Sequence, residues 1–143
     1  MRGRKNDRGL LEARKGILSV LFAYPSVNQH LKEFLSPEEI GGGIPAKLLE
    51  IAYLNEEKSV ADIISQFESL EEQQQTAELL KDQPNFENTS AMEKSVNEMW
   101  RIVKKAHFIE QMSGETDLNV INTLGSALRN LEKQYISLNN GVK

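Results

Sequence analysis

The sequence contains no cysteine, and this absence excludes disulfide bonds, thiolate nucleophiles and zinc sites built on thiolates. Apolar residues form 39% of the 143-residue chain, and no run approaches the roughly 18 apolar residues of a membrane span. The charged amino-terminal stretch is not followed by the apolar segment of a signal peptide, because Arg14 and Lys15 interrupt it. We therefore expect no membrane association, and the lack of a targeting segment favours the cytoplasm.

The sequence also lacks segments in which apolar and polar residues alternate, which is the pattern of a half-buried strand. Apolar residues instead recur at spacings of three and four, so we predict an all-α fold. We expect helices over residues 10–23, 45–54 and 70–81, and two further helices that begin at residues 26 and 59. They form a compact bundle over residues 10–88, and the polar connection at Pro84–Asn88 separates it from a carboxy-terminal unit over residues 89–143.

The net charge of −4 is unevenly distributed. Residues 1–15 hold six basic and two acidic side chains, for a net +4, and the rest of the chain carries −8. Phosphate binding requires clustered cations, so the acidic body is a poor surface for nucleic acid. Residues 1–9 are basic, polar and without periodicity, which indicates a flexible linker. Contact of this segment with nucleic acid is the alternative.

The carboxy-terminal unit is predicted to be an antiparallel helical hairpin with a tight turn at Ser113–Thr116. Its second arm extends to Leu138. Ser90 and Glu93 have the spacing of a capping box, Gly114 suits a left-handed residue after the first arm, and Thr116 or Asp117 opens the second. Two apolar stripes are expected to face each other: Met92, Val96, Met99, Val103 and Ala106 on the first arm, and Ile121, Leu124, Leu128, Leu131, Tyr135 and Leu138 on the second.

Several apolar residues of this unit lie off the two stripes. A two-helix hairpin leaves such residues without a partner helix, and an exposed apolar surface usually marks a protein interface. The alternative is that they pack in the core of the chain itself. These residues are Ile102, Phe108, Ile109, Met112, Leu118, Val120 and Ile136.

Little in the sequence indicates a catalytic or metal site. His107 and Glu110 lie one turn apart, but the facing stripe offers no further good metal ligand, so we expect an exposed pair and no metal site. Gly41–Gly43 lacks the preceding strand and following Lys-Ser/Thr of a phosphate loop, which indicates a flexible connection and no cofactor site. Trp100, the single tryptophan, is expected to lock the hairpin onto the bundle, with an interface anchor as the alternative.

The chain resembles the carboxy-terminal helicase-binding domain of bacterial DnaG-type replicative primases from about Leu11 to Leu138. The resemblance lies in the opening helix with its aromatic-proline end at Ile17–Pro25, the helix at Ser59–Phe67, the long helix around Met99–Lys105 and the terminal hairpin. The Gly41–Gly43 run and the short link between the arms depart from the family pattern.

This resemblance implies a non-catalytic domain that binds the N-terminal domain of the hexameric replicative helicase and couples primer synthesis to DNA unwinding. The parent chain would be a primase, a DNA-directed RNA polymerase of replication, and this fragment would be a monomer alone. By position on the last helix, the expected partner-binding residues are Arg129, Glu132, Lys133, Gln134 and Ile136. Two alternatives stay open: a self-associating all-α module, and an N-terminal domain of the helicase itself.

Overall fold

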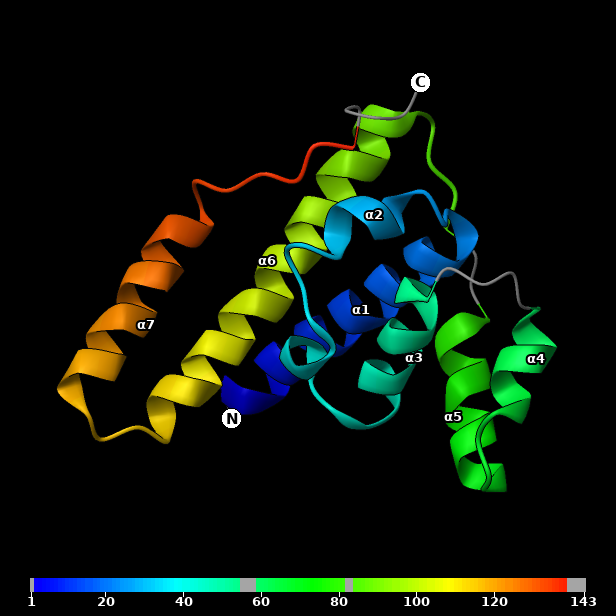
Figure 1. Ribbon diagram of the computed structural model, residues 1–143, viewed down its shortest axis with the longest axis horizontal. Coiled ribbons are helices and arrows are strands. Elements are labelled where there is room, and N and C mark those ends of the chain that lie inside the picture. Colours follow the sequence, from blue (N-terminus) through cyan, green and yellow to red (C-terminus); the bar gives the residue numbers. More distant parts are fainter. Residues whose placement is uncertain (1, 55–58, 82–83, 139–143) are drawn as a thin grey trace.

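A computed structural model describes residues 2–54, 59–81 and 84–138, and every regular element in these ranges is helical (Figure 1). The all-α prediction is confirmed. In the part of the chain described, no helix is both long enough and apolar enough to cross a membrane. The elements are α1 (Arg2–Ala23), α2 (Val27–Leu31), the 3₁₀ helix η1 (Pro37–Ile40), α3 (Gly43–Tyr53), α4 (Val60–Ser65), α5 (Leu70–Leu80), α6 (Thr89–Ser113) and α7 (Leu118–Leu131).

Helix α1 begins earlier than its apolar pattern predicts. The expected helix starts at Leu10, whereas the backbone is helical from Arg2, so the segment expected to be an irregular linker is mostly helical. Arg and Lys are good helix formers, and a helix already nucleated by the packed residues extends at little cost. The predicted end of the helix before Pro25 is confirmed, since α1 stops at Ala23.

Local capping signals set the starts of the short helices. Ser36 and Glu39 form a capping box before η1, with Pro37 at the first helical position. Ser59 and Asp62 form another at α4, where the Ser59 hydroxyl accepts from the Asp62 N–H at 3.1 Å. Each box satisfies amide groups that the first helical turn leaves without a partner, so these starts are fixed by sequence alone.

Helix α6 is the long element along which α1, η1 and α7 are arranged (Figure 1). At its crossing with α1, the sulfur of Met99 lies where a Cβ on Gly16 would stand, only 2.2 Å from that position. The absence of a side chain at Gly16 therefore lets the two helices approach closely. One hydrophobic core includes residues from α1, α3, α6 and the segment after α7, so the bundle and the carboxy-terminal unit share it.

Trp100 of α6 is fully buried in this core. Its indole Nε1 donates to the carbonyl oxygen of Phe34 at 3.0 Å, and the two rings meet edge to face with centroids 5.6 Å apart. The expected lock between α6 and the bundle is confirmed, because the ring and its polar atom are both engaged with the α2–η1 connection.

The glycine run lies between η1 and α3. Gly41, Gly42 and Gly43 all have positive φ, at 120°, 68° and 63°, which is a region that favours glycine. Residues with side chains are strained there, so the run provides a sharp reversal between two helices. Gly41 also lies against the guanidinium of Arg14, whose Nη2 would be 2.5 Å from a Cβ at this position.

Two predicted caps of the long helix are wrong. Helix α6 starts after Asn88, whose side-chain oxygen accepts from the Ala91 N–H at 2.8 Å, and Ser90 lies inside the helix. Asn88 lies two residues earlier in the same polar stretch and supplies an equally good cap acceptor. At the other end, Gly114 has φ of −97° and is not left-handed.

Candidate functional site

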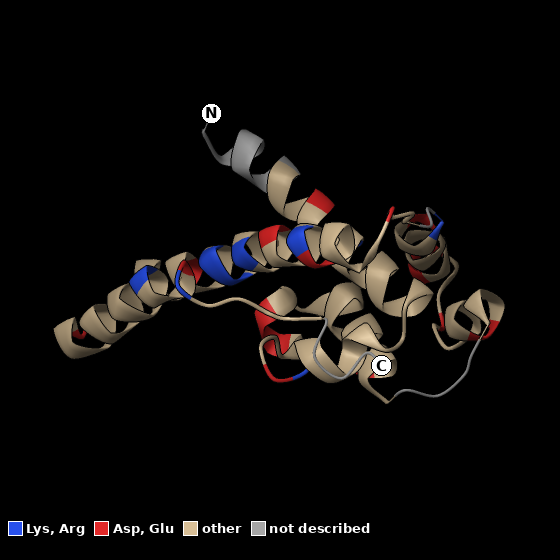
Figure 2. Cartoon of the chain, turned by 90° about the horizontal axis from the view of Figure 1, so that it is seen from above, with Lys and Arg blue, Asp and Glu red and all other residues tan. Residues whose placement is uncertain are grey.

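The α6–α7 arm, meaning α7, the carboxy-terminal half of α6 and the turn between them, extends beyond the rest of the molecule (Figures 1 and 2). The two helices lie side by side and pack against each other. Asp117 begins α7 as predicted, with its carboxylate accepting from the Asn119 N–H at 2.8 Å. The Glu115 carboxylate accepts from the N–H groups of Thr116 and Asp117. The turn is therefore held by its own acidic side chains.

The expected face-to-face pairing of the two stripes is only partly present. Met99 packs on Gly16 of α1, and this face of α6 joins the bundle core. Because α1 packs on much of the apolar stripe of α6, less of that stripe is left to cover the apolar face of α7. Leu131 is the buried residue of α7, while Ile121, Leu124 and Leu128 are only partly buried.

The arm carries large apolar side chains in contact with solvent, and we call Ile102, Ile109, Leu118 and Val120 the exposed apolar set. Leu118 is 73% exposed and Ile109 is 49% exposed. Ile102 and Ile109 are seven residues apart and share one face of α6. Phe108 and Met112, also expected off the stripes, are partly buried. Exposed apolar residues grouped on one projecting element are typical of a protein interface.

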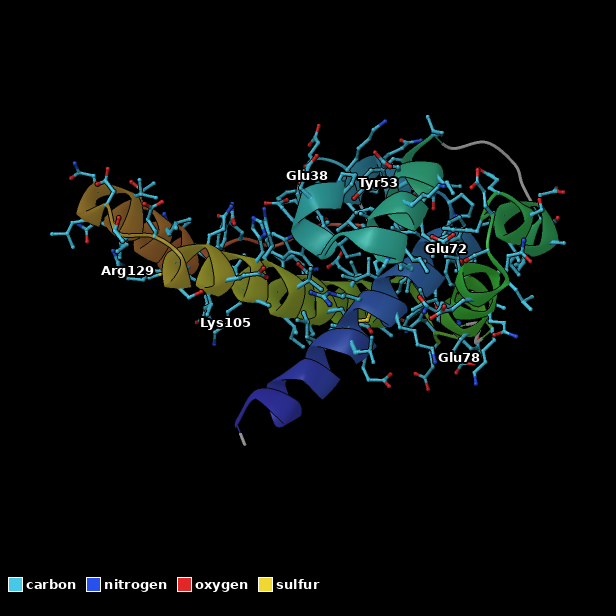
Figure 3. All side chains as sticks on the ribbon, turned by 90° about the horizontal axis from the view of Figure 1, so that it is seen from below. Glu38, Tyr53, Glu72, Glu78, Lys105 and Arg129 are labelled. Atoms are coloured by element: carbon cyan, nitrogen blue, oxygen red, sulfur yellow. The ribbon has the colours of Figure 1, made fainter. Side chains whose placement is uncertain are left out.

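Four of the five predicted contact residues are exposed. Arg129 lies in the last turn of α7 and points away from the ribbon in Figure 3, as does Lys105 of α6. Glu132 is the C-cap residue that follows α7, Lys133 lies in the turn after it, and Gln134 comes next. The structure thus brings Arg129 near the end of a helix but does not place all four on one helical face.

The fifth residue, Ile136, is buried with 1% exposure, so the expectation that it faces a partner is wrong for this conformation. The reason is that α7 ends at Leu131 and does not continue to Leu138. Residues 132–138, which we call the strap, turn back along α6 (Figure 1). The strap buries Ile136 and Leu138 in the core and leaves Tyr135 half exposed.

A row of polar side chains on α6 binds the backbone of the strap. Asn97 donates to the Ile136 carbonyl at 2.9 Å and accepts from its N–H at 2.8 Å. One turn away, the Glu93 carboxylate accepts from the Leu138 N–H at 2.8 Å. One turn in the other direction, the Arg101 guanidinium donates to the Gln134 carbonyl at 2.7 Å.

The spacing explains why this row fits an extended chain. Four residues of α-helix rise about 6 Å, and two residues of extended chain advance about 6.6 Å. Residues 93, 97 and 101 of α6 therefore match residues 138, 136 and 134 of the strap in antiparallel order. Four backbone groups of the strap are satisfied in this way without a second strand.

Sequence reasoning missed this row, although a signal for it exists. Glu93 and Asn97 lie on the inward-facing side of α6, beside its apolar stripe, and Asn97 is fully buried. A polar side chain at a buried helical position must find a hydrogen-bond partner, so it predicts a tertiary contact. The identity of that partner, 39 residues away in the chain, is not encoded locally.

A cleft of about 700 Å³ lies between the glycine run and the α6–α7 arm. His107, Glu110 and Val120 line it from the arm, and Arg14 and Glu38 line it from the body. The Nε atom of Arg14 is buried there without a hydrogen-bond partner. Among the residues that the structure describes, no three His, Cys, Asp or Glu side chains are grouped to hold a metal ion.

An ion pair between Lys104 of α6 and Glu39 of η1 fixes the arm to the body near this cleft. Burial tends to raise the pKa of Glu39, but the Lys104 ammonium and the Ser36 N–H outweigh burial and hold the pKa below its ordinary value. Figure 2 shows both basic and acidic bands along α6 and acidic residues on the body. Helix α6 is thus held on the body by the Lys104–Glu39 pair as well as by the buried Trp100.

Comparison of the chain with protein-family models, with curated proteins and with solved structures finds no significant match.

Proposed function

We propose that this chain is a non-catalytic docking domain of a bacterial DnaG-type primase. Its partner is the N-terminal domain of the hexameric replicative helicase, and the complex couples primer synthesis to unwinding in the cytoplasm. The proposal draws on the resemblance of the helix pattern from Leu11 to Leu138. The observation that carries it is the exposed apolar set on the α6–α7 arm, because exposed apolar side chains on one projecting element are typical of a surface that binds a protein.

The contact we propose combines this set with the exposed polar residues at the end of α7. Ile109 and Leu118 supply apolar area, and Arg129, Glu132, Lys133 and Gln134 supply charge and hydrogen bonds at the rim. This division matches the usual anatomy of an interface, with an apolar centre and a polar edge. The domain itself needs no cofactor for this role.

Binding of the full chain to the helicase N-terminal domain tests the proposal. Ile109→Asp and Leu118→Asp should each weaken association at least about tenfold, since a buried charge at an interface is costly. Leu70→Asp is the matched control, because Leu70 of α5 is 69% exposed on another part of the chain. It should leave the affinity unchanged. Wild-type chain that shows no association at about 50 µM contradicts the proposal.

Self-association is the competing function, since the same exposed apolar set would pair two copies of the chain. Sedimentation equilibrium at high concentration separates the two. The docking domain should sediment as a monomer, whereas a self-associating module should form a dimer that Ile109→Asp dissociates. A helicase N-terminal domain would instead assemble into ring-related oligomers.

A further inference from the structure

We propose that the strap, residues 132–138, is a two-state segment that exchanges between the extended form bound to α6 and a helical form that continues α7. Opening would release Ile136 and Leu138 from the core and lengthen the arm by about two turns. The role of this exchange in partner binding rests on the proposed docking function. The exchange itself does not depend on it.

The helical form is encoded in the sequence. Leu124, Leu128, Leu131, Tyr135 and Leu138 are spaced by four, three, four and three residues, which places them on one helical stripe. Between Leu131 and Leu138 the chain reads Glu-Lys-Gln-Tyr-Ile-Ser, without glycine or proline. Glu, Lys and Gln are good helix formers, so this segment favours continuation of α7.

Nothing local stops α7 at Leu131. The C-cap residue Glu132 remains in the right-handed helical region, and residues 133–138 contain no glycine that could end the helix. The next amides still form short-range helical bonds, from the Lys133 N–H to the Asn130 carbonyl and from the Gln134 N–H to the Leu131 carbonyl. The helical winding therefore continues past Leu131 before the strap turns back along α6.

The extended form is stabilised by tertiary contacts alone. The Glu93, Asn97 and Arg101 side chains bind the backbone of the strap, and the core takes up Ile136 and Leu138. The local preference for helix and the tertiary preference for an extended chain thus oppose each other in the part of the strap that lies along α6. A segment with two such competing conformations responds to any ligand that binds one of them better.

Opening changes what the arm presents. In the closed form, in which the strap is bound to α6, Ile136 is buried and cannot contact a partner. Arg129 lies in α7, whereas Lys133 lies in the turn after it. In the helical form, residues 129, 133 and 136 lie on one face, since they are spaced by four and three. The open form therefore carries a longer contact surface with an additional apolar side chain, and we expect the helicase domain to select it.

Two substitutions shift the equilibrium in opposite directions. Asn97→Ala removes both bonds to Ile136 and should favour the open form. Ser137→Pro should favour the closed form, because proline disrupts a helix and directs the preceding residue to an extended conformation. The strap donates to α6 through the amides of Ile136 and Leu138, so proline at 137 removes neither of these bonds. Ser137→Ala is the matched control, since alanine accepts both forms and slightly favours helix.

NMR of the full chain measures the exchange without any partner. Asn97→Ala should raise the open-to-closed ratio about five- to thirtyfold, seen as helical ¹³Cα shifts over residues 132–138 and faster amide exchange at Ile136. Adding Ser137→Pro should abolish the helical shifts. Ser137→Ala alone should raise the ratio about twofold, which keeps the test valid if Asn97→Ala unfolds the chain.

The inference is overturned if residues 132–138 become irregular, without helical shifts, when the strap is released. It is also overturned if Ser137→Ala and Ser137→Pro give the same spectra. Binding to the helicase N-terminal domain then tests the coupling: Ser137→Pro should weaken association and Ser137→Ala should not. A chain that exchanges as described but never binds the helicase domain contradicts the proposed function alone.

Discussion

Asn97 pairs with both main-chain polar groups of Ile136, so a single helical side chain takes the place of a neighbouring strand. The Asn97 amide also donates to the Glu93 carbonyl one turn back in α6 at 2.8 Å. The side chain is fully buried, and its oxygen and nitrogen are both engaged. This pair joins residues 39 apart in the sequence and closes the core over α6.

Replacing Asn97 with alanine should therefore destabilise the fold. It leaves the N–H and carbonyl of Ile136 without partners, and each unsatisfied buried group costs about 1–3 kcal/mol when water does not reach it. We expect a loss of about 1–2 kcal/mol in the free energy of unfolding, measured by urea denaturation. Asn122→Ala, at an exposed position of α7, should change it by less than about 0.5 kcal/mol.

Trp100→Ala should cost about 3–5 kcal/mol, since it removes a fully buried ring and the bond to the Phe34 carbonyl. Trp100→Phe should cost less, because an aromatic ring remains against Phe34 while the hydrogen bond is lost. Thermal unfolding followed by circular dichroism measures both. A smaller loss for Trp100→Ala than for Trp100→Phe would contradict the role of the ring as the lock.

The Lys104–Glu39 pair predicts a pH dependence. The pKa of Glu39 is lowered in the folded state, so its contribution to stability is complete above its ordinary value of 4.5. That contribution is lost as the pH falls through the lowered folded pKa. Lys104→Met should therefore reduce the stability difference between about pH 5 and pH 3, measured by denaturation at each pH. Lys105→Met, at an exposed neighbouring position, should retain the wild-type pH profile.

Two helical glycines should respond oppositely to alanine. A Cβ at Gly125 of α7 meets only the Arg129 guanidinium at 3.7 Å, so Gly125→Ala should stabilise the chain by about 0.5–1 kcal/mol. At Gly16, the Met99 sulfur occupies the Cβ position, and the alanine must displace it. Gly16→Ala should lose about 1 kcal/mol despite its better helix propensity. Equal gains for both variants would contradict the close approach of α1 and α6.

Local sequence patterns are enough to predict the all-α fold, a helix that begins near residue 59, and the end of α1 before Pro25. These features depend on apolar periodicity or on groups within one helical turn, so a local pattern contains all the information they need. The burial of Trp100 was also predicted, because a large apolar ring beside an apolar stripe has few other places to go.

The end of α7 and the covered face of α6 depend on contacts between residues far apart in the chain. The stripe from Leu124 to Leu138 favours one long helix, yet Glu93, Asn97 and Arg101 hold the last residues as an extended strap. Local preference is worth a fraction of a kcal/mol per residue, whereas burying Ile136 and Leu138 stabilises the strap by about 1.5–3 kcal/mol each. The larger energy comes from residues about 40 positions away, and for that reason the sequence pattern placed Ile136 on the wrong side.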